Sequence, residues 1–322
     1  MNNPLEKLSG NFFYKAIKEQ LGLIIGLLAL CLALSIISPV FLSSRNVFNI
    51  LRQLSTNMFL SCGMLLVILL GGIDLSVGST IAVTGCLVAG FITNNGMSPM
   101  AAIFLALLFG LLIGVVTGGI IASTSIPPFI ITLAMMNIGR GIARLYTSSK
   151  TISINNDFFG FIGTGYVGIV PTQVFYIIVV CIITWLILNK TKTGRNIYAT
   201  GGNLMAANFS GINTKRVTFF VYVFSSLMAS LAGILLASRM FSGTSTAGTS
   251  AEMDAIAAVV LGGTSMSGGV GTLFGTIIGV VLIAVLSNGM NLLGIDSSWQ
   301  LVVKGIVILI AVYIDFIKKQ QV

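Results

Sequence analysis

The stretch Leu70-Gly71-Gly72-Ile73-Asp74-Leu75-Ser76-Val77-Gly78 interrupts an apolar segment, and a related stretch interrupts another one near the C-terminus. The second stretch is Leu261-Gly262-Gly263-Thr264-Ser265-Met266-Ser267-Gly268-Gly269, in which Leu, Gly, Gly, Ser and Gly recur in the same order and spacing. Within a membrane, unwound backbone is tolerated only where it is packed in protein or lines a cavity. Paired interrupted segments therefore predict a route by which a molecule crosses the membrane.

The composition indicates that much of the surface faces lipid. Of the 322 residues, 56% are hydrophobic and only 8% are charged, and the mean hydropathy is +1.03. In a soluble domain of this size, about a quarter of the residues are charged. Since no polar stretch is long enough to build a second core, we expect residues 1–322 to form a single transmembrane domain.

Apolar runs predict an all-α, polytopic membrane bundle of about ten transmembrane helices, because about 20 apolar residues cross the hydrocarbon core. The cores of the predicted crossings are residues 21–37, 58–70, 75–92, 100–122, 129–142, 174–188, 217–237, 255–261, 273–286 and 301–316. Three of these cores (58–70, 129–142 and 255–261) are too short to cross alone. We expect broken, short or re-entrant helices there, associated with the two glycine breaks.

Glycines repeated every fourth residue predict two seams of close helix contact, since small residues let neighbouring helices approach. The two sets are Gly110, Gly114 and Gly118, and Gly271, Gly275 and Gly279. We assign no ligand to either set.

Lysine and arginine predict the orientation, because they are enriched in cytoplasmic segments. With ten crossings, one side holds Lys7, Lys15, Lys18, Lys190, Lys192, Arg195, Lys215, Arg216, Lys318 and Lys319. The other side holds Arg45, Arg52, Arg140, Arg144, Lys150 and Arg239, and Lys304 falls inside the last crossing. Both termini are therefore predicted to be cytoplasmic.

Two polar connections are longer than ordinary connectors. Residues 189–216 form the inner one, where we expect a short amphipathic helix between basic flanks. Residues 146–171 form the outer one, which suits the docking of a partner or serves as a plain connector.

Several function classes are excluded by what the sequence lacks. The net charge of +9 is divided among short segments between apolar runs, so no basic stripe for nucleic acid is expected. The chain has no histidine, and its four cysteines are far apart within apolar runs, which argues against a metal or redox site. No P-loop or hydrolase motif occurs, so the chain is not expected to be an enzyme by itself or to hold a cofactor.

Asp74 is the most informative of the acidic residues, since it follows the first glycine break and opens the third crossing. It is predicted to cap that helix, to contact a substrate, or to do both. Glu252 and Asp254 are expected to cap the eighth crossing, and Asp296 to be solvated. An ion-driven carrier needs several buried ionisable groups, and Asp74 is a single one. We therefore expect the energy for transport to be supplied from outside this chain.

Four motifs resemble those of the sugar-uptake ABC transporter permeases, the family that includes the ribose importer. They are Gly71-Gly72-Ile73-Asp74-Leu75-Ser76-Val77-Gly78-Ser79, Thr246-Ala247-Gly248-Thr249, Asp254-Ala255-Ile256-Ala257-Ala258-Val259-Val260-Leu261-Gly262-Gly263-Thr264-Ser265 and Asn288-Gly289-Met290-Asn291-Leu292-Leu293-Gly294. The matches are ordered and extend from about Phe48 to the C-terminus.

The resemblance implies a bacterial cytoplasmic-membrane subunit that pairs with a second permease, as a homodimer or with a related chain. It also implies a cytoplasmic ABC ATPase, which binds ATP and Mg²⁺, and an extracytoplasmic sugar-binding protein. The segment that would press into the ATPase contains Gly194, Arg195, Asn203, Met205, Ala206, Ala207, Ser210, Gly211 and Ile212. Met205 departs from the family, which often has glutamate there, so an ion pair made by that glutamate would be lost.

The sequence therefore predicts the membrane subunit of an ATP-driven importer for a small monosaccharide, with ribose as the first candidate. The alternative is an ion-coupled secondary transporter. A neutral sugar needs hydroxyl and amide partners, and the predicted substrate path consists of Asp74, Ser76, Ser79, Phe129, Asn288 and Asn291. The competing interpretation is that these polar side chains hold helices together.

Overall fold

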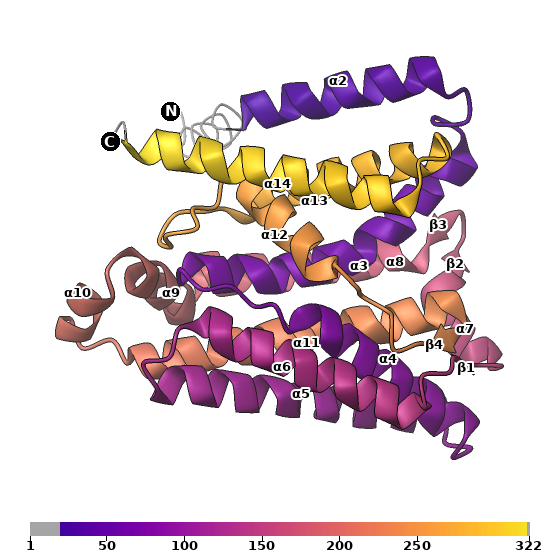
Figure 1. Cartoon of the computed structure of the whole chain (residues 1–322), viewed down its shortest axis with the longest axis horizontal. Coiled ribbons are helices and arrows are strands. Elements are labelled where there is room, and N and C mark those ends of the chain that lie inside the picture. Colours follow the sequence, from indigo (N-terminus) through magenta and orange to yellow (C-terminus); the bar gives the residue numbers. More distant parts are fainter. Residues whose placement is uncertain (1–19, 321–322) are drawn as a thin grey trace, which may run out of the picture.

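The computed structural model describes residues 20–320 and is a bundle of helices (Figure 1). Each of the ten predicted crossings corresponds to one helix, apart from one or two terminal residues of 58–70 and 75–92. The helices are α2 (Leu21–Ile37), α3 (Ser44–Leu69), α4 (Val77–Thr93), α5 (Pro99–Ser123), α6 (Pro128–Thr147), α8 (Thr172–Lys190), α11 (Thr214–Met240), α12 (Ala251–Leu261), α13 (Leu273–Leu292) and α14 (Ser297–Gln320). Five of them (α3, α5, α8, α11 and α13) are long and apolar enough to cross a membrane, and α2, α4 and residues 297–310 are shorter apolar helices. The predicted class, a helical membrane bundle, is confirmed.

The remaining elements are short and lie at the two ends of the bundle (Figure 1). One end, here called the α9 end, carries α9 (Lys192–Gly202) and α10 (Leu204–Phe209). The other, the α7 end, carries α7 (Asp157–Thr164) and four two-residue strands: β1 (Ile152–Ser153), β2 (Tyr166–Val167), β3 (Val170–Pro171) and β4 (Ser242–Gly243). β1 pairs with β4 and β2 with β3, both antiparallel.

Helix α2 begins and helix α14 ends at the α9 end (Figure 1). The described ends of the chain therefore lie on one side of the bundle, as an even number of crossings requires. The predicted inner residues Lys7, Lys15 and Lys18 lie outside the described residues.

Two of the three short crossings are complete helices. Helix α3 has 26 residues because polar positions 44–57 continue the helix, which starts where Ser43 Oγ accepts the Asn46 N–H at 3.3 Å. Helix α6 has 20 residues and starts with Pro128, whose fixed φ suits the first turn. The expectation of broken helices at 58–70 and 129–142 was wrong, whereas α12 is short, with 11 residues.

Helices α4 and α12 both begin in the interior of the bundle and run towards opposite ends (Figure 1). Their N-termini meet at Gly78 and Gly248, where a Cβ on Gly78 would lie 2.6 Å from the Gly248 carbonyl oxygen. Inside the bundle, the non-helical segment that lies opposite the first break is therefore the chain before α12, residues 243–250. Residues 262–272 instead follow α12 at the α9 end.

The predicted glycine seams are helix contacts except at Gly271, which lies in the loop before α13 rather than on its face. A Cβ on Gly110 would lie 1.7 Å from Ser230 Oγ of α11, and one on Gly114 would lie 2.7 Å from Ser226 Cβ of the same helix. A Cβ on Gly279 would lie 1.9 Å from the carbonyl oxygen of Ala258 in α12. These glycines allow α5 to approach α11, and α13 to approach α12, more closely than larger residues would.

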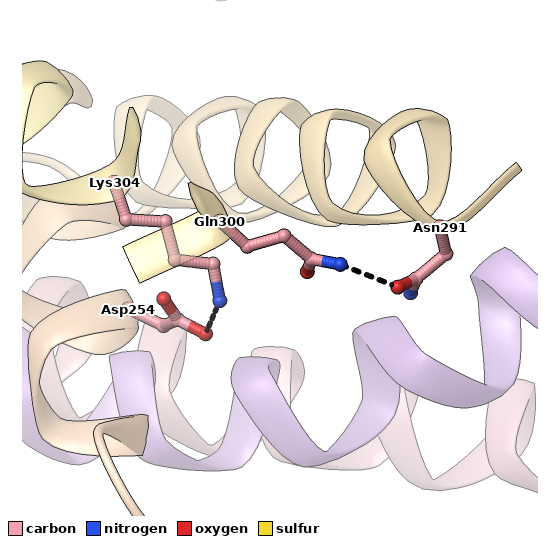
Figure 2. A network of polar contacts seen from close by, with 4 residues as sticks. All are labelled: Asp254, Asn291, Gln300 and Lys304. Carbon is pink, nitrogen blue, oxygen red and sulfur yellow. Dashed lines mark hydrogen bonds and ion pairs between the residues drawn. The ribbon is translucent and has the colours of Figure 1, made fainter. Parts of the chain in front are cut away.

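Helix α14 is attached to the bundle by two polar contacts (Figure 2). Lys304 Nζ lies 2.8 Å from Asp254 Oδ2 of α12, with the side chains only 18% and 15% exposed, and Gln300 Nε2 donates to Asn291 Oδ1 of α13 at 2.9 Å. Asp254 therefore pairs with a cation rather than capping α12, whose N-cap residue is Ser250.

The loop before α14 contains Asp296, which is exposed as predicted. The backbone N–H of Ser298 donates to Asp296 Oδ1 at 2.8 Å, and this bond lowers the pKa of the carboxyl group.

We predict that Lys304→Leu lowers the free energy of unfolding by about 3 kcal/mol, because it leaves the carboxylate of Asp254 without its partner in a mostly buried position. Thermal unfolding of the detergent-solubilised protein measures this loss. The double variant Asp254→Leu/Lys304→Leu removes both charges and should recover most of the stability. A single variant that unfolds at the wild-type temperature would contradict the prediction.

Candidate functional site

Asp74 is 1% exposed and connects the first break to two helices. Its Oδ1 accepts the Ser76 backbone N–H at 3.0 Å and the Ser76 hydroxyl at 2.6 Å, and its Oδ2 accepts the Ser225 hydroxyl of α11 at 2.8 Å. Both carboxylate oxygens are therefore bonded within the chain. Asp74 fixes the turn that leads into α4 by accepting hydrogen bonds from Ser76, which is the N-cap residue of that helix, so Asp74 does not cap α4 itself as predicted.

Around the start of α4, the structure gathers three of the six predicted path residues. Ser76 accepts the Ser79 hydroxyl at its carbonyl oxygen at 2.8 Å, and Ser79 packs against Gly139 of α6. Opposite them lies Glu252, in the first turn of α12, since a Cβ on Gly78 would come within 2.1 Å of Glu252 Oε2. Asp74, Ser76 and Ser79 thus lie where α4 and α12 meet.

Two charged residues at this meeting point were not predicted to belong to it. Glu252 is 8% exposed, and its Oε2 has no hydrogen-bond partner among the described residues. Arg140 of α6 donates from Nη1 to the carbonyl oxygens of Ser245 at 2.9 Å and Ala247 at 2.6 Å. Arg140 therefore holds the turns that precede α12, a contact between distant segments that sequence spacing does not reveal.

The other three predicted path residues lie elsewhere. Asn288 of α13 forms a reciprocal amide pair with Asn46 of α3, with both N–O distances 2.9 Å, which joins the two helices. Asn291 lies at the α7 end of α13. Phe129 is 49% exposed, at the start of α6. The structure thus separates these residues from the meeting point of α4 and α12.

A polar cavity of about 450 Å³ lies between helices at the α7 end, and we call it the α7 cavity. Its lining residues are Asn49, Arg52, Gln53, Thr164, Arg239 and Asn291. Arg52 Nη2 donates to the Tyr166 hydroxyl at 2.5 Å, and Arg239 Nη1 donates to the Arg52 carbonyl oxygen at 3.0 Å. Of the lining, only Asn291 was among the predicted path residues, although the polar stretch before residue 58 was a signal for Asn49, Arg52 and Gln53.

At the α9 end, the two glycine breaks contact each other and α9. The Gly269 N–H donates to the Leu69 carbonyl oxygen at 2.8 Å, and a Cβ on Gly71 would lie 3.2 Å from the Ser267 carbonyl oxygen. A Cβ on Gly201 of α9 would lie only 1.7 Å from the same Leu69 oxygen. We call this contact of Leu69, Gly71, Gly201, Gly268 and Gly269 the glycine junction.

The predicted coupling segment forms two short helices instead of one. Its residues Gly194 and Arg195 lie in α9, Met205, Ala206 and Ala207 in α10, and Asn203, Ser210, Gly211 and Ile212 in the flanking turns. Asn203 caps α10 by accepting the Ala206 N–H at 2.9 Å. Gly211 has a φ of +80°, which permits the turn into α11.

Helix α10 buries a single residue and exposes its large apolar side chains. Ala207 is 4% exposed, whereas Met205 is 68% and Phe209 is 89% exposed. Since α10 lies beyond the ends of the membrane helices (Figure 1), these apolar side chains form an uncovered surface outside the bundle.

Comparison with known proteins identifies the family. Residues 46–312 match the family model for the permease component of branched-chain amino acid transport systems. The chain is 45% identical to the ribose import permease protein RbsC of Escherichia coli (strain K12) over 308 residues, which cover 94% of this chain and 96% of the relative. It is 46% identical to the protein of the same name from Bacillus subtilis (strain 168), with 94% of each chain covered.

The chain belongs to the ABC importer permease family. It is also 32% identical to the xylose transport system permease protein XylH of Haemophilus influenzae, over 87% of this chain and 91% of the relative. No solved structure matches. As a permease it is a membrane component of a transport system rather than an enzyme, and the comparisons give the ion-coupled alternative no support.

We predict that Gly201→Ala in this permease reduces substrate uptake at least about tenfold, because the new Cβ has no room beside the Leu69 carbonyl and must displace α9 from the glycine junction. Gly202→Ala is the matched control, since a Cβ there meets nothing within 4 Å. Uptake into reconstituted vesicles measures the difference. Equal uptake by the two variants would contradict a role for the junction.

Proposed function

We propose that this permease imports ribose or a related small neutral monosaccharide across the bacterial cytoplasmic membrane. The ribose import permeases are 45% and 46% identical to it over nearly the whole chain, compared with 32% for the xylose permease. A neutral sugar is also compatible with the buried hydroxyls of Ser76 and Ser79 and with the amide of Asn291 in the lining of the α7 cavity.

The energy comes from a separate cytoplasmic ATPase that binds ATP and Mg²⁺, so this chain needs no cofactor of its own. Helices α9 and α10 are the proposed docking site. The observation that supports this most is the arrangement of these two helices: α10 carries exposed apolar side chains, while Gly201 of α9 touches the backbone at both glycine breaks. A push on α10 and α9 would thus reach the start of the segment that leads to α4.

The orientation and the other partners follow from this assignment. The α9 end, with the basic residues between Lys190 and Arg216, faces the cytoplasm, and both termini are proposed to be cytoplasmic. The α7 end faces outward and receives the sugar-binding protein. A second permease, in a homodimer, completes the translocation unit within the lipid bilayer, and no nucleic acid is involved.

The predicted path residues are not equally well supported. They are Asp74, Ser76, Ser79, Asn288, Asn291 and Phe129. Asn291 has the strongest support, because it lines the α7 cavity. Asp74 and Asn288 have their polar groups engaged by Ser76, Ser225 and Asn46, so they are proposed to shape the path rather than to hold the sugar.

Reconstitution in vesicles tests the function as a whole. The permease is combined with a candidate ATPase and binding protein, and uptake of labelled ribose is followed. We expect uptake to require ATP hydrolysis and to be unchanged when ion gradients are collapsed. Gradient-driven uptake by the permease alone would refute the proposal.

We predict that Phe209→Asp weakens association with the ATPase at least about tenfold, because an exposed aromatic anchor at an interface contributes about 2 kcal/mol or more. Ile169→Asp is the matched control, since Ile169 is 82% exposed at the opposite end of the bundle. Co-purification of the ATPase with each full-length variant measures association. Equal yields for the two variants would contradict docking on α10.

A further inference from the structure

The chain before α12 is exposed at a level of the bundle that lies within the membrane. Residues 243–250 run between β4 and α12 as a non-helical segment (Figure 1), in which Thr246 and Thr249 are exposed. From here the 11 residues of α12 extend about 16 Å towards the α9 end, and the 17 residues of α4 extend about 26 Å towards the α7 end. Since the hydrocarbon core is about 30 Å thick, the segment lies at its depth.

Lipid cannot cover this surface. Irregular backbone at the depth of the hydrocarbon core occurs only where it is buried in protein or lines a water-filled cavity. Asn137 of α6, one turn before Arg140, is exposed as well. We call the surface formed by Asn137, Arg140, Thr246 and Thr249 the α6–α12 face. It therefore faces water or the second permease of the proposed pair.

Glu252 lies beside the α6–α12 face, and one of its carboxylate oxygens has no partner. The side chain is 8% exposed, and Oε2 forms no hydrogen bond within residues 20–320. A Cβ on Gly78 would come within 2.1 Å of Oε2, so the first turn of α4 covers this oxygen. An ionisable group left unsatisfied at this depth is costly, and it indicates a functional role.

Arg140 supplies hydrogen-bond donors at the same place. It uses only Nη1 to bind two backbone carbonyl oxygens before α12 and forms no other hydrogen bond in the described part of the chain. Arg140 and Glu252 attract each other electrostatically, yet the only ion pair among residues 20–320 is that of Lys304 with Asp254. The guanidinium and the carboxylate are therefore near each other without forming a direct pair.

This combination favours a neutral ligand with several hydroxyl groups. Arg140 repels a cation, and Glu252 repels an anion. A hydroxyl group can donate to a carboxylate and accept from a guanidinium, so neighbouring hydroxyls of one molecule can bind both residues. The hydroxyls of Thr246 and Thr249 offer further donors and acceptors on the same face.

We propose that Glu252 and Arg140 bind hydroxyl groups of the transported monosaccharide at the α6–α12 face, and that Oε2 of Glu252 becomes available when α4 moves away from the start of α12. This inference rests on the proposed function, whose substrate class it uses. It adds charged residues to a path for which the sequence alone offered Ser76 and Ser79 at this meeting of two helices.

Binding is tested with the full-length permease in lipid nanodiscs, without the binding protein. Saturation-transfer NMR is recorded with D-ribose, and with acetate and tetramethylammonium as charged probes, for the wild type, Glu252→Gln and Thr249→Val. Asp296→Asn is the matched control for the carboxylate, because Asp296 is exposed in the loop before α14. Thr124→Val is the matched control for the hydroxyl, because Thr124 is exposed directly after α5.

We expect a saturable ribose signal for the wild type and for both controls. In Glu252→Gln the half-saturating concentration should rise at least about tenfold, which corresponds to about 1.4 kcal/mol. In Thr249→Val it should rise at least about threefold, because one hydrogen-bonding hydroxyl is lost.

Thermal unfolding of each variant shows first whether it folds as the wild type does. The proposal is overturned by an unchanged half-saturating concentration in Glu252→Gln or, if that variant does not fold, in Thr249→Val, whose position is exposed. A wild type that gives no saturable ribose signal, or that binds either charged probe instead of ribose, would also overturn it.

Uptake by the complete transporter separates this inference from the proposed function. If wild-type vesicles take up ribose with ATP and Glu252→Gln does so at the wild-type rate and half-saturation, the site is wrong and the function stands. If wild-type vesicles show no ATP-dependent ribose uptake, the proposed function itself fails.

Discussion

The structure depends on close contact between backbones at positions that have no side chain. A membrane interior offers no water to satisfy an unwound peptide group, so each break in a helix must be packed against protein. At the glycine junction, the Leu69 carbonyl oxygen accepts the Gly269 N–H and lies against Gly201. At the meeting of α4 and α12, Gly78 lies against the Gly248 carbonyl. A methyl group at either place would separate elements that these breaks hold together.

These two contacts lie in different parts of the molecule, one inside the bundle and one at the α9 end. The meeting of α4 and α12 lies within the bundle, fixed by Asp74, Arg140 and the hydroxyl of Ser225. The glycine junction lies at the α9 end, where the connection to the proposed ATPase site begins. The segment between Leu69 and Val77 belongs to both contacts, so α9 touches the chain that positions the start of α4.

Polar side chains in the membrane serve two different purposes here. Some bind a polar partner within the chain: Asn46 is hydrogen-bonded to Asn288, and Lys304 forms an ion pair with Asp254. These pairs join α3 to α13 and α14 to α12. Others are left without a partner, as are the hydroxyls of Ser61 and Ser287. The first group joins helices of the bundle, whereas the hydroxyls of the second group make no such connection within the described part of the chain.

The sequence by itself determined the class, the ten helices and the family, because hydropathy and ordered motifs are local properties of the chain. It also placed Asp74 shortly before a helix and a long polar connection between the helices now seen as α8 and α11. Only the tertiary structure showed that residues 243–250 match the first break inside the bundle, that Asn288 is paired with Asn46, and that Arg52 and Gln53 line a cavity. These facts depend on contacts between residues more than 100 positions apart, and no local spacing encodes which distant backbone a glycine will touch.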